Sequence, residues 1–266
     1  MVQLMDRPRI GQYILTRQLE PGPLGPRDLA LHDLDSSSHV IHRPRVGRDR
    51  AEQRRFLAVM NAAKLIGHPH ILPIEEFGLD ERGHPYIVTP FTGDSTGLVT
   101  VESLMTVKGG FFSPSEARQA VVQVLEAVEA AHRTGQRHGK LSMSGILVDR
   151  RGSIAIELYG VARLLHVTVD EGGDAESDEV RSVIRIGYQL VTGLVPEEPL
   201  IAAGRVVPGL DAVWDDWFET GLHSPVGFKS AAHALSAIRD RSAIGAAQQQ
   251  VRGVRSVISR LLFSGR

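Results

Sequence analysis

Few side chains in this 266-residue chain have the type and the spacing that a reaction centre needs. The eleven histidines are scattered, and none belongs to the His-Glu-x-x-His pattern that places two zinc ligands on one helix face. His39 and His42 are three residues apart, a spacing that points them to opposite faces of a strand. The chain has no cysteine, which excludes thiolate metal sites, disulfides and cysteine nucleophiles.

The composition narrows the function classes further. Thirty basic and 31 acidic side chains give a net charge of -1, so no excess positive field attracts nucleic acid. Only four basic residues are lysine, and none precedes Lys64. The lack of cysteine is typical of a reducing compartment. Residues 1–9 lack the apolar region of a secretory signal. The sequence also has no run of about 18 apolar residues, so no membrane span is predicted. We therefore expect a cytoplasmic protein.

The first 92 residues predict short strands and one helix. Residues 51–66 carry apolar side chains at helical spacing, and Pro69 disfavours any continuation of that helix. Turn-forming residues separate the remaining apolar segments. The strands predicted in this way are residues 13–19, 28–32, 39–41, 74–77 and 86–91.

From residue 100 the pattern becomes helical. Ser113 predicts a helix N-cap, with Pro114 at the first helical position and Glu116 closing a capping box, for a helix that continues through residues 117–131. Two short strands at 146–149 and 153–157 flank a turn. Further helices are predicted at 180–191, 209–220 and 230–238. With a Gly/Thr/Ser connector at 92–97, this order predicts an α+β fold of two lobes.

Residues 241–266 differ from the rest of the chain. They contain five arginines and no acidic residue, with apolar residues at helical spacing at positions 251, 254, 258, 261 and 262. A basic amphipathic helix of this kind binds an anionic membrane surface or packs on a partner. A terminal helix that docks on its own domain, or a frayed tail, is the alternative interpretation.

Four segments, in their order, resemble the eukaryotic-like serine/threonine protein kinases of bacteria over about residues 10–240. Residues 55–72 resemble the helix of the N-terminal lobe and the turn after it, 138–148 the catalytic loop, 157–163 the metal-binding turn, and 182–193 the long helix of the C-terminal lobe. The resemblance implies a bilobal kinase-like fold. The expected parts are an N-lobe at 10–92, a hinge at 93–99, a C-lobe at 100–240 and the basic segment at 241–266.

Under this resemblance, residues 19–27 take the place of the glycine-rich loop that covers the nucleotide phosphates. Glu20 stands where the first glycine is expected, and three prolines in the loop lack N–H donors. We therefore expect a rigid turn between two strands. Val40 stands over the expected adenine site and narrows the pocket, while Leu147 keeps the apolar floor of the pocket. The vestigial pocket is thus expected at Gly22, Gly25, Val40 and Leu147.

The lysine that pairs with the phosphates is replaced by His42. A histidine with an ordinary pKa of about 6.5 carries little charge at pH 7. No shift of register supplies a lysine, because none precedes Lys64. The glutamate partner of that lysine is replaced by Val59, so the loss of both leaves no orphaned charge.

The catalytic and metal-binding positions are changed as well. Lys140 stands where the family has the aspartate that accepts the substrate proton, and a protonated lysine is no base. Gly145 and Leu158 stand where the family has its metal-binding asparagine and aspartate, and neither side chain offers a ligand atom. Glu157 is adjacent, but the alternation of side chains along a strand predicts that it points away from the site.

The chain keeps residues at the packing positions of the family but has lost the side chains that bind phosphate and metal there. His138 and Tyr159 occupy packing positions, and Glu179 matches the acid that anchors the long helix. Only 19 positions separate Gly160 from Glu179, which leaves little length for an activation segment. Gly227 takes the place of an arginine that the family pairs with that segment.

These changes predict a pseudokinase: a catalytically inactive kinase-like domain with no cofactor and no metal. We expect it to bind or scaffold another protein, an active kinase or a signalling complex, and not nucleic acid. Two alternatives stay open. One is an unconventional ATP-dependent kinase or another phosphate or nucleotidyl transferase, and the other is a membrane-peripheral adaptor that uses residues 241–266.

Overall fold

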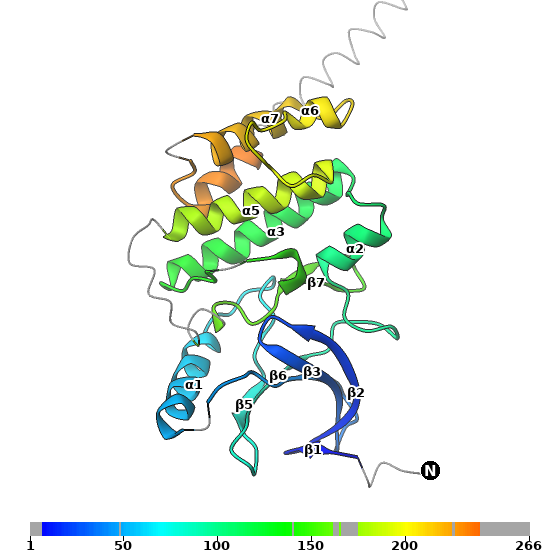
Figure 1. Cartoon of the computed structure of the whole chain (residues 1–266), viewed down its shortest axis with the longest axis vertical. Coiled ribbons are helices and arrows are strands. Elements are labelled where there is room, and N and C mark those ends of the chain that lie inside the picture. Colours follow the sequence, from blue (N-terminus) through cyan, green and yellow to red (C-terminus); the bar gives the residue numbers. More distant parts are fainter. Residues whose placement is uncertain are drawn as a thin grey trace, which may run out of the picture.

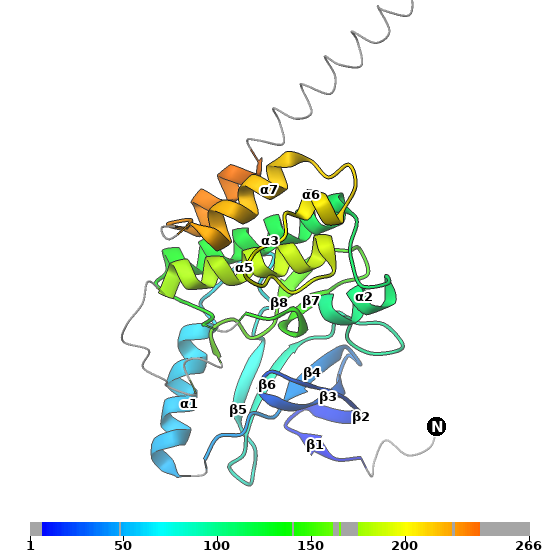
Figure 2. The same ribbon diagram turned by 45° about the horizontal axis from the view of Figure 1, so that its top comes forward.

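The computed structural model describes residues 7–47, 49–139, 141–161, 165, 175–224 and 227–239. Two lobes are stacked along the long axis of the molecule (Figures 1 and 2). One lobe is an antiparallel sheet with helix α1 (Arg50–Ala63), and the other is mainly helical. The bilobal α+β architecture predicted from the sequence is therefore confirmed.

The N-terminal lobe is built on one antiparallel sheet with the strand order β1-β2-β3-β4-β6-β5. The register sets Arg27 opposite His42, and Val40 opposite Thr89. All five predicted strands are present, whereas β1, with only two residues, was not predicted. The strands are β1 (Arg9–Ile10), β2 (Tyr13–Gly22), β3 (Gly25–His32), β4 (Ser38–His42), β5 (Glu76–Leu79) and β6 (Pro85–Pro90).

Helix α1 covers one end of this sheet (Figure 1). It begins after Asp49, whose side chain accepts hydrogen bonds from the backbone N–H groups of Ala51 and Glu52. Its apolar face buries Phe56 and Met60 completely. These residues belong to a core that also includes residues of the second lobe, here termed the α1 cluster: Leu24, Phe56, Met60, Ala63, Ile74, Ile87, Leu158 and Val161.

The C-terminal lobe packs its helices around α3 (Pro114–Arg133) and α5 (Ala175–Thr192), which lie side by side (Figures 1 and 2). The predicted capping box at the start of α3 is confirmed, because Ser113 and Glu116 each accept a backbone N–H of the other. Trp214, Trp217 and Phe218 are buried in the core. The remaining helices are α2 (Val101–Val107), α6 (Ala203–Val206), α7 (Ala212–Phe218), the π-helical turn η2 (Glu219–His223) and residues 231–239.

A short hairpin joins the lobes. Strands β7 (Ile146–Val148) and β8 (Ile154–Ile156) pair with each other, and the backbone N–H of Leu72, after α1, donates to the carbonyl of Ile156 at 2.9 Å. On the other side, the N–H of Val148 donates to the carbonyl of Val99 at 2.8 Å. The hairpin is thus fixed between the segment that follows α1 and the connector between the lobes.

Part of the sequence lies outside the described residues. This applies to residues 170–174, which begin an acidic stretch at 170–179, and to the basic segment 241–266. None of the described helices combines the length and the apolar composition that crossing a membrane requires.

Candidate functional site

A buried ion pair joins the two lobes where the resemblance places the vestigial nucleotide pocket. Arg27 lies on β3 and Glu157 directly follows β8; the Nη1 atom of Arg27 is 2.7 Å from each carboxylate oxygen of Glu157. The Nε atom of Arg27 donates to the carbonyl of Glu20 at 2.6 Å. The side chains of Arg27 and Glu157 are 3% and 0% exposed. Protein atoms therefore enclose the pair on all sides.

His42 extends this pair into a buried polar network. Its Nε2 atom lies 2.9 Å from the Oγ1 atom of Thr89 and 3.9 Å from the Oε1 atom of Glu157. Burial, together with the nearby charge of Arg27, lowers the pKa of His42 to about 3, so the imidazole is neutral at pH 7. Burial also raises the pKa of Glu157, while the charge and hydrogen bonds of Arg27 act in the opposite direction. Arg27 is the permanently charged cation of the network, and the carboxylate of Glu157 already pairs with it.

The turn between β2 and β3 rests on this network. A Cβ atom on Gly22 would lie 3.1 Å from the Nη1 atom of Arg27 and 3.3 Å from the Oε2 atom of Glu157. A Cβ atom on Gly145 would lie 3.7 Å from the Cγ atom of Pro23, so the tip of the turn reaches the catalytic-loop segment of the other lobe. Leu24 is buried in the α1 cluster. The turn therefore packs against both lobes.

Glu157 faces Arg27 where the two lobes meet, so the prediction from strand alternation that it points away from the site was wrong. β8 ends at Ile156, and Leu158 has a φ of +49°, in the left-handed region that leucine rarely adopts. Alternation of side chains requires an extended backbone, so the rule stops applying at this point. Leu158 turns into the α1 cluster, where it is 3% exposed. Glu157 is left facing Arg27.

The other predicted positions lie either beside this buried network or in the cores of the lobes. Val40 on β4 and Leu147 on β7 are each 1% exposed. Val59 on α1 packs against the α1 cluster, whereas His42 faces Thr89 and Glu157. Gly25 has a φ of +124°, which favours glycine, and Gly145 ends a 3-10 turn. Lys140 lies outside the described residues.

Glu179 anchors α5 to the catalytic-loop segment. Its carboxylate accepts the backbone N–H of His138 at 2.9 Å and the hydroxyl of Tyr159, and lies 3.5 Å from the Nε2 atom of His132. Burial raises the pKa of this carboxyl, but the neighbouring His132 and the hydrogen bond from Tyr159 outweigh that effect and hold the pKa below its usual value. The rings of His138 and Tyr159 meet edge to face at 5.1 Å. The sequence match of Glu179 to the anchoring acid agrees with this geometry.

A second candidate, a Gly-x-Ser-x-Gly sequence at residues 93–97, lies in the connector between the lobes. Asp94 turns the chain back on itself, because its carboxylate accepts the backbone N–H and the hydroxyl of Thr96. The carbonyl of Ser95 accepts a hydrogen bond from Arg17. A nucleophile elbow needs a strand that leads through the serine into a helix, and a loop does not supply that context. The similarity is therefore one of sequence alone.

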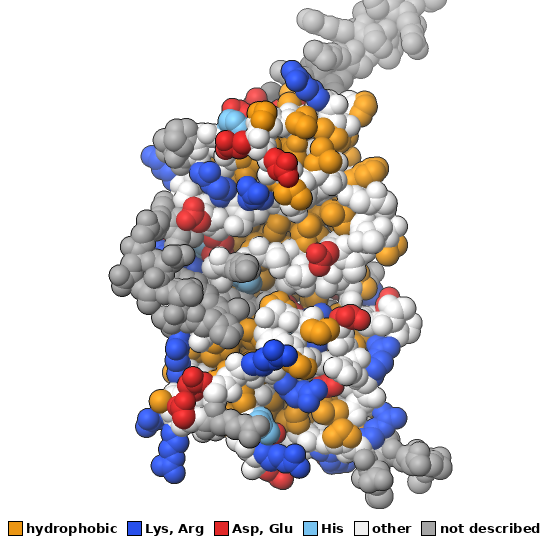
Figure 3. Space-filling view, viewed as in Figure 1, with side chains coloured by type: hydrophobic (Ala, Val, Ile, Leu, Met, Phe, Trp, Pro, Cys, Tyr) orange, Lys and Arg blue, Asp and Glu red, His pale blue; other side chains and the backbone are white. Residues whose placement is uncertain are grey.

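Two further features of the described residues are the placement of potential metal ligands and the distribution of surface charge. Within the described ranges, no cluster of three or more histidine, aspartate or glutamate side chains is arranged to hold a metal ion. On the face shown in Figure 3, basic and acidic side chains are interspersed over both lobes. This distribution agrees with the net charge of -1.

A solved protein shares this fold, and curated proteins are similar in sequence. The solved kinase domain of PknI from Mycobacterium tuberculosis matches 87% of this chain and 97% of its own length, with a TM-score of 0.67 and 20% identity. The serine/threonine-protein kinase PknK of the same species is 27% identical over 165 residues, and the CBL-interacting protein kinase 31 of Oryza sativa is 25% identical over 241 residues. The chain is a protein kinase-like domain. It is distantly homologous to serine/threonine protein kinases.

The homology of this kinase-like domain is distant and partial. No family model matches the chain. The matched segments cover 60% of the chain for PknK and 80% for the rice kinase. They span only 12% of PknK and 52% of the rice kinase.

The Arg27–Glu157 pair is the part of the site that sequence reasoning missed. The two residues are 130 positions apart, and the side chain of neither stands out in its own segment. One signal was present: Glu157 directly follows an apolar strand, and a buried carboxylate needs a cationic partner. The sequence does not say which of its 26 arginines supplies that partner, 26 being the 30 basic residues less four lysines.

Proposed function

We propose that this kinase-like domain is a pseudokinase that transfers no phosphate and acts by binding another protein. The observation that supports this most is the buried network of Arg27, Glu157 and His42, which takes up the cleft where the resemblance places the nucleotide phosphates. Phosphoryl transfer relies on groups that neutralise phosphate charge and orient the nucleophile. The cation of this network is already neutralised by a carboxylate.

The energetics of this network oppose a nucleotide. A triphosphate placed beside Arg27 would bring its negative charges next to Glu157, or would have to separate the pair. Leaving one partner of a buried pair without its counter-charge costs about 3–5 kcal/mol. His42, whose pKa is about 3, adds no compensating charge at pH 7. Binding of a phosphate group would therefore begin with a large energetic deficit.

The remaining positions are filled by residues that do not perform the chemistry. Lys140 would be a cation where a proton acceptor is needed. Gly145 has no ligand atom, and Leu158 is turned into the α1 cluster. Glu157, the nearest carboxylate, is held by Arg27. This set of replacements favours a non-catalytic role.

A role in protein binding is supported by what the domain keeps. The contacts of Glu179 hold the catalytic-loop segment on α5, and the cores of both lobes are well buried. A domain that closes its own cleft presents the same surface whether or not nucleotide is present. Such a surface suits a scaffold or regulator, and an active kinase or a signalling complex is the class of partner that we propose.

The proposal is tested by thermal unfolding with ATP and Mg²⁺ or Mn²⁺. A ligand at about 100 times its Kd stabilises a protein by about 2.7 kcal/mol, which is a shift of several degrees in Tm for a domain of this size. We expect no shift and no transfer of labelled γ-phosphate. A metal-dependent shift that is lost in His42→Ala or Lys140→Ala, but kept in the matched surface variant Lys229→Ala, would refute the proposal.

The binding role has its own test. The full chain is purified from its native cells at low salt, and the amount of each co-purifying protein is measured relative to the chain. We expect one partner in stoichiometric amount, recovered equally well with wild type and with Lys140→Ala. Recovery of the chain alone under these conditions would contradict a scaffolding role.

A further inference from the structure

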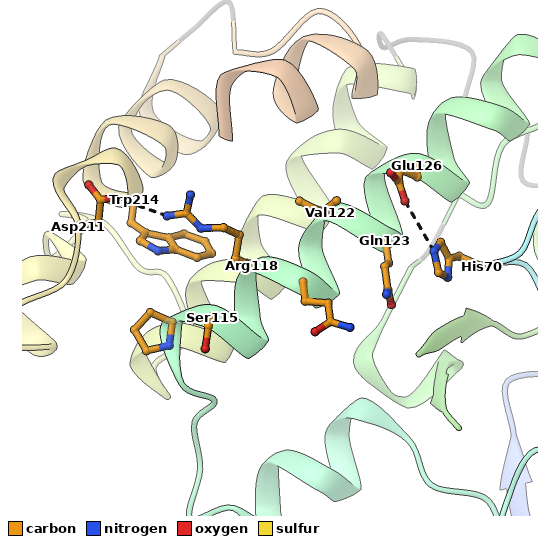
Figure 4. A pocket seen from close by; sticks show the side chains of 10 residues that line it. His70, Ser115, Arg118, Val122, Gln123, Glu126, Asp211 and Trp214 are labelled. Atoms are coloured by element: carbon orange, nitrogen blue, oxygen red, sulfur yellow. Dashed lines mark ion pairs between the residues drawn. The ribbon is translucent and has the colours of Figure 1, made fainter. Parts of the chain in front are cut away.

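A groove of about 580 Å³ runs along α3 in the helical lobe (Figure 4). None of its lining residues belongs to the buried network between the lobes. An ion pair stands at each end of it: Arg118 with Asp211 at 3.7 Å, where α7 begins, and His70 with Glu126 at 3.6 Å. The lining residues used below are Arg118, Gln119, Val122, Glu126, Asp211 and Trp214.

The middle of this α3 groove is apolar, and each end carries a partly exposed carboxylate in an ion pair. Val122 packs against the core of the helical lobe, and the guanidinium of Arg118 lies 5.4 Å from the ring centre of Trp214. The carboxylate-bearing side chains of Glu126 and Asp211 are 30% and 45% exposed. A groove with this pattern suits the apolar face of an amphipathic helix that carries basic side chains on its flanks.

The chain itself arrives at the groove. The Nη1 atom of Arg118 donates to the carbonyl of Ile238 at 3.3 Å, and Arg239 forms an ion pair with Glu126. Arg118 and Glu126 both line the groove, so the chain beyond Arg239 begins at its rim. Residues 240–266 would be about 40 Å long as a helix at 1.5 Å per residue, compared with about 30 Å for α3. The segment is long enough to follow the whole groove.

The chemistry of residues 241–266 matches that of the α3 groove. Their five arginines, with no acidic residue, offer further cations to the partly exposed carboxylates of Glu126 and Asp211, which already pair with Arg239 and Arg118. Their apolar residues recur at spacings of three and four, as in helices that bind in grooves: Val251, Val254, Ile258 and Leu261. We propose that residues 241–266 bind along the α3 groove of their own chain, with the apolar face of the segment on Val122. This inference does not depend on the proposed pseudokinase role, because the groove and the cleft share no residue.

The first test uses photo-crosslinking in the full-length chain. A benzophenone amino acid replaces Gln119, which is exposed on α3 and lines the groove. The control position is Leu34, which is 82% exposed in the other lobe. A segment tethered at the rim has a high effective concentration there, so we expect crosslinks from position 119 to map to residues 241–266, with a yield about tenfold above that from position 34.

Three results of this experiment would overturn the proposal. Crosslinks from position 119 that map outside residues 241–266, or equal yields from the two positions, would show that the segment does not occupy the groove. In an equal mixture of light and heavy-isotope chains, crosslinks between a light and a heavy chain would assign the groove to a second copy. Crosslinks within single chains are the result that we expect.

The second test separates charge from fold. Arg252→Glu with Arg255→Glu should lower the yield from position 119 about tenfold, because it reverses the charge that meets Glu126 and Asp211, whereas Arg252→Lys with Arg255→Lys should keep it. Unchanged yield in the glutamate variant would contradict the proposal. The chain could instead float with phosphatidylserine vesicles in a way that requires residues 241–266, and form no crosslink when vesicles are absent. That result would assign the segment to a membrane surface and refute the proposal.

Discussion

Breaking the buried Arg27–Glu157 pair should destabilise the domain strongly. Arg27→Met leaves the Glu157 carboxylate without its counter-charge, and Glu157→Leu does the same to the guanidinium. Since the two side chains are 3% and 0% exposed, water does not replace the missing partner. Each single variant should therefore cost about 3–5 kcal/mol of unfolding free energy. For a domain of this size, that corresponds to a fall in Tm of about 6–20 °C.

The double variant Arg27→Met/Glu157→Leu shows whether the cost arises from the unpaired charge. Replacing a buried ion pair by apolar residues of similar volume is often neutral or stabilising, so the double variant should lie within about 2 kcal/mol of wild type. Urea unfolding at pH 7 gives all four free energies, and the two single effects should be far from additive. Arg9→Met, at the exposed pair with Asp33, is the matched control and should cost about 0–1 kcal/mol.

Two outcomes would refute this reasoning. If each single variant costs no more than the Arg9→Met control, the pair is not a desolvated interaction. If the double variant loses about the sum of the two single effects, roughly 6–10 kcal/mol, the cost is lost packing and not an unpaired charge.

Three further predictions concern the same framework. The pKa of His42 falls from 6.5 to about 3 on folding, so the unfolded chain binds the proton first and the folded state loses stability as the pH falls below 6.5. Between pH 7 and pH 4, His42→Gln should therefore lose about 3 kcal/mol less unfolding free energy than wild type. Urea unfolding free energies that fall in parallel with pH in the two proteins would contradict this. Tyr159→Phe removes a hydrogen-bond donor to the charged Glu179 and should cost about 1.5–3 kcal/mol of unfolding free energy in urea. Tyr188→Phe, whose hydroxyl donates to a neutral carbonyl, should cost only about 0.5–1.5 kcal/mol. Equal costs for the two variants would contradict this. Ser113→Ala should cost about 1 kcal/mol in the same assay by removing the cap of α3, and no loss would contradict the capping role.

The sequence predicts those parts of the fold whose causes are local. Alternation and turn residues locate the strands of the N-terminal lobe, and the capping box at Ser113 marks the start of α3. Helix α2 was not predicted, because of its seven residues only Val101 is buried and the apolar pattern is too short to be recognised. A short helix of this kind is stabilised mainly by its packing on neighbouring elements.

The candidate site was predicted in part, and the failure has one physical cause. The residue types alone predict which catalytic and binding positions of the family are replaced. The partner of Glu157, in contrast, depends on how the two lobes meet. The direction of Glu157 was wrong because Leu158 leaves the extended conformation and turns into the α1 cluster. Alternation is a property of the strand, and β8 had already ended.

The Arg27–Glu157 pair also links the two halves of the proposed function. A buried ion pair adds little net stability, but it disfavours arrangements that separate its partners. A shift of the lobes that separated the pair but left one of the charges buried would cost about 3–5 kcal/mol, which lowers the population of that arrangement by two to four orders of magnitude. The pair that we propose to exclude phosphate therefore also disfavours such shifts of the lobes. A partner that touches both lobes then loses little affinity to conformational rearrangement, because the binding-competent form is already the dominant one.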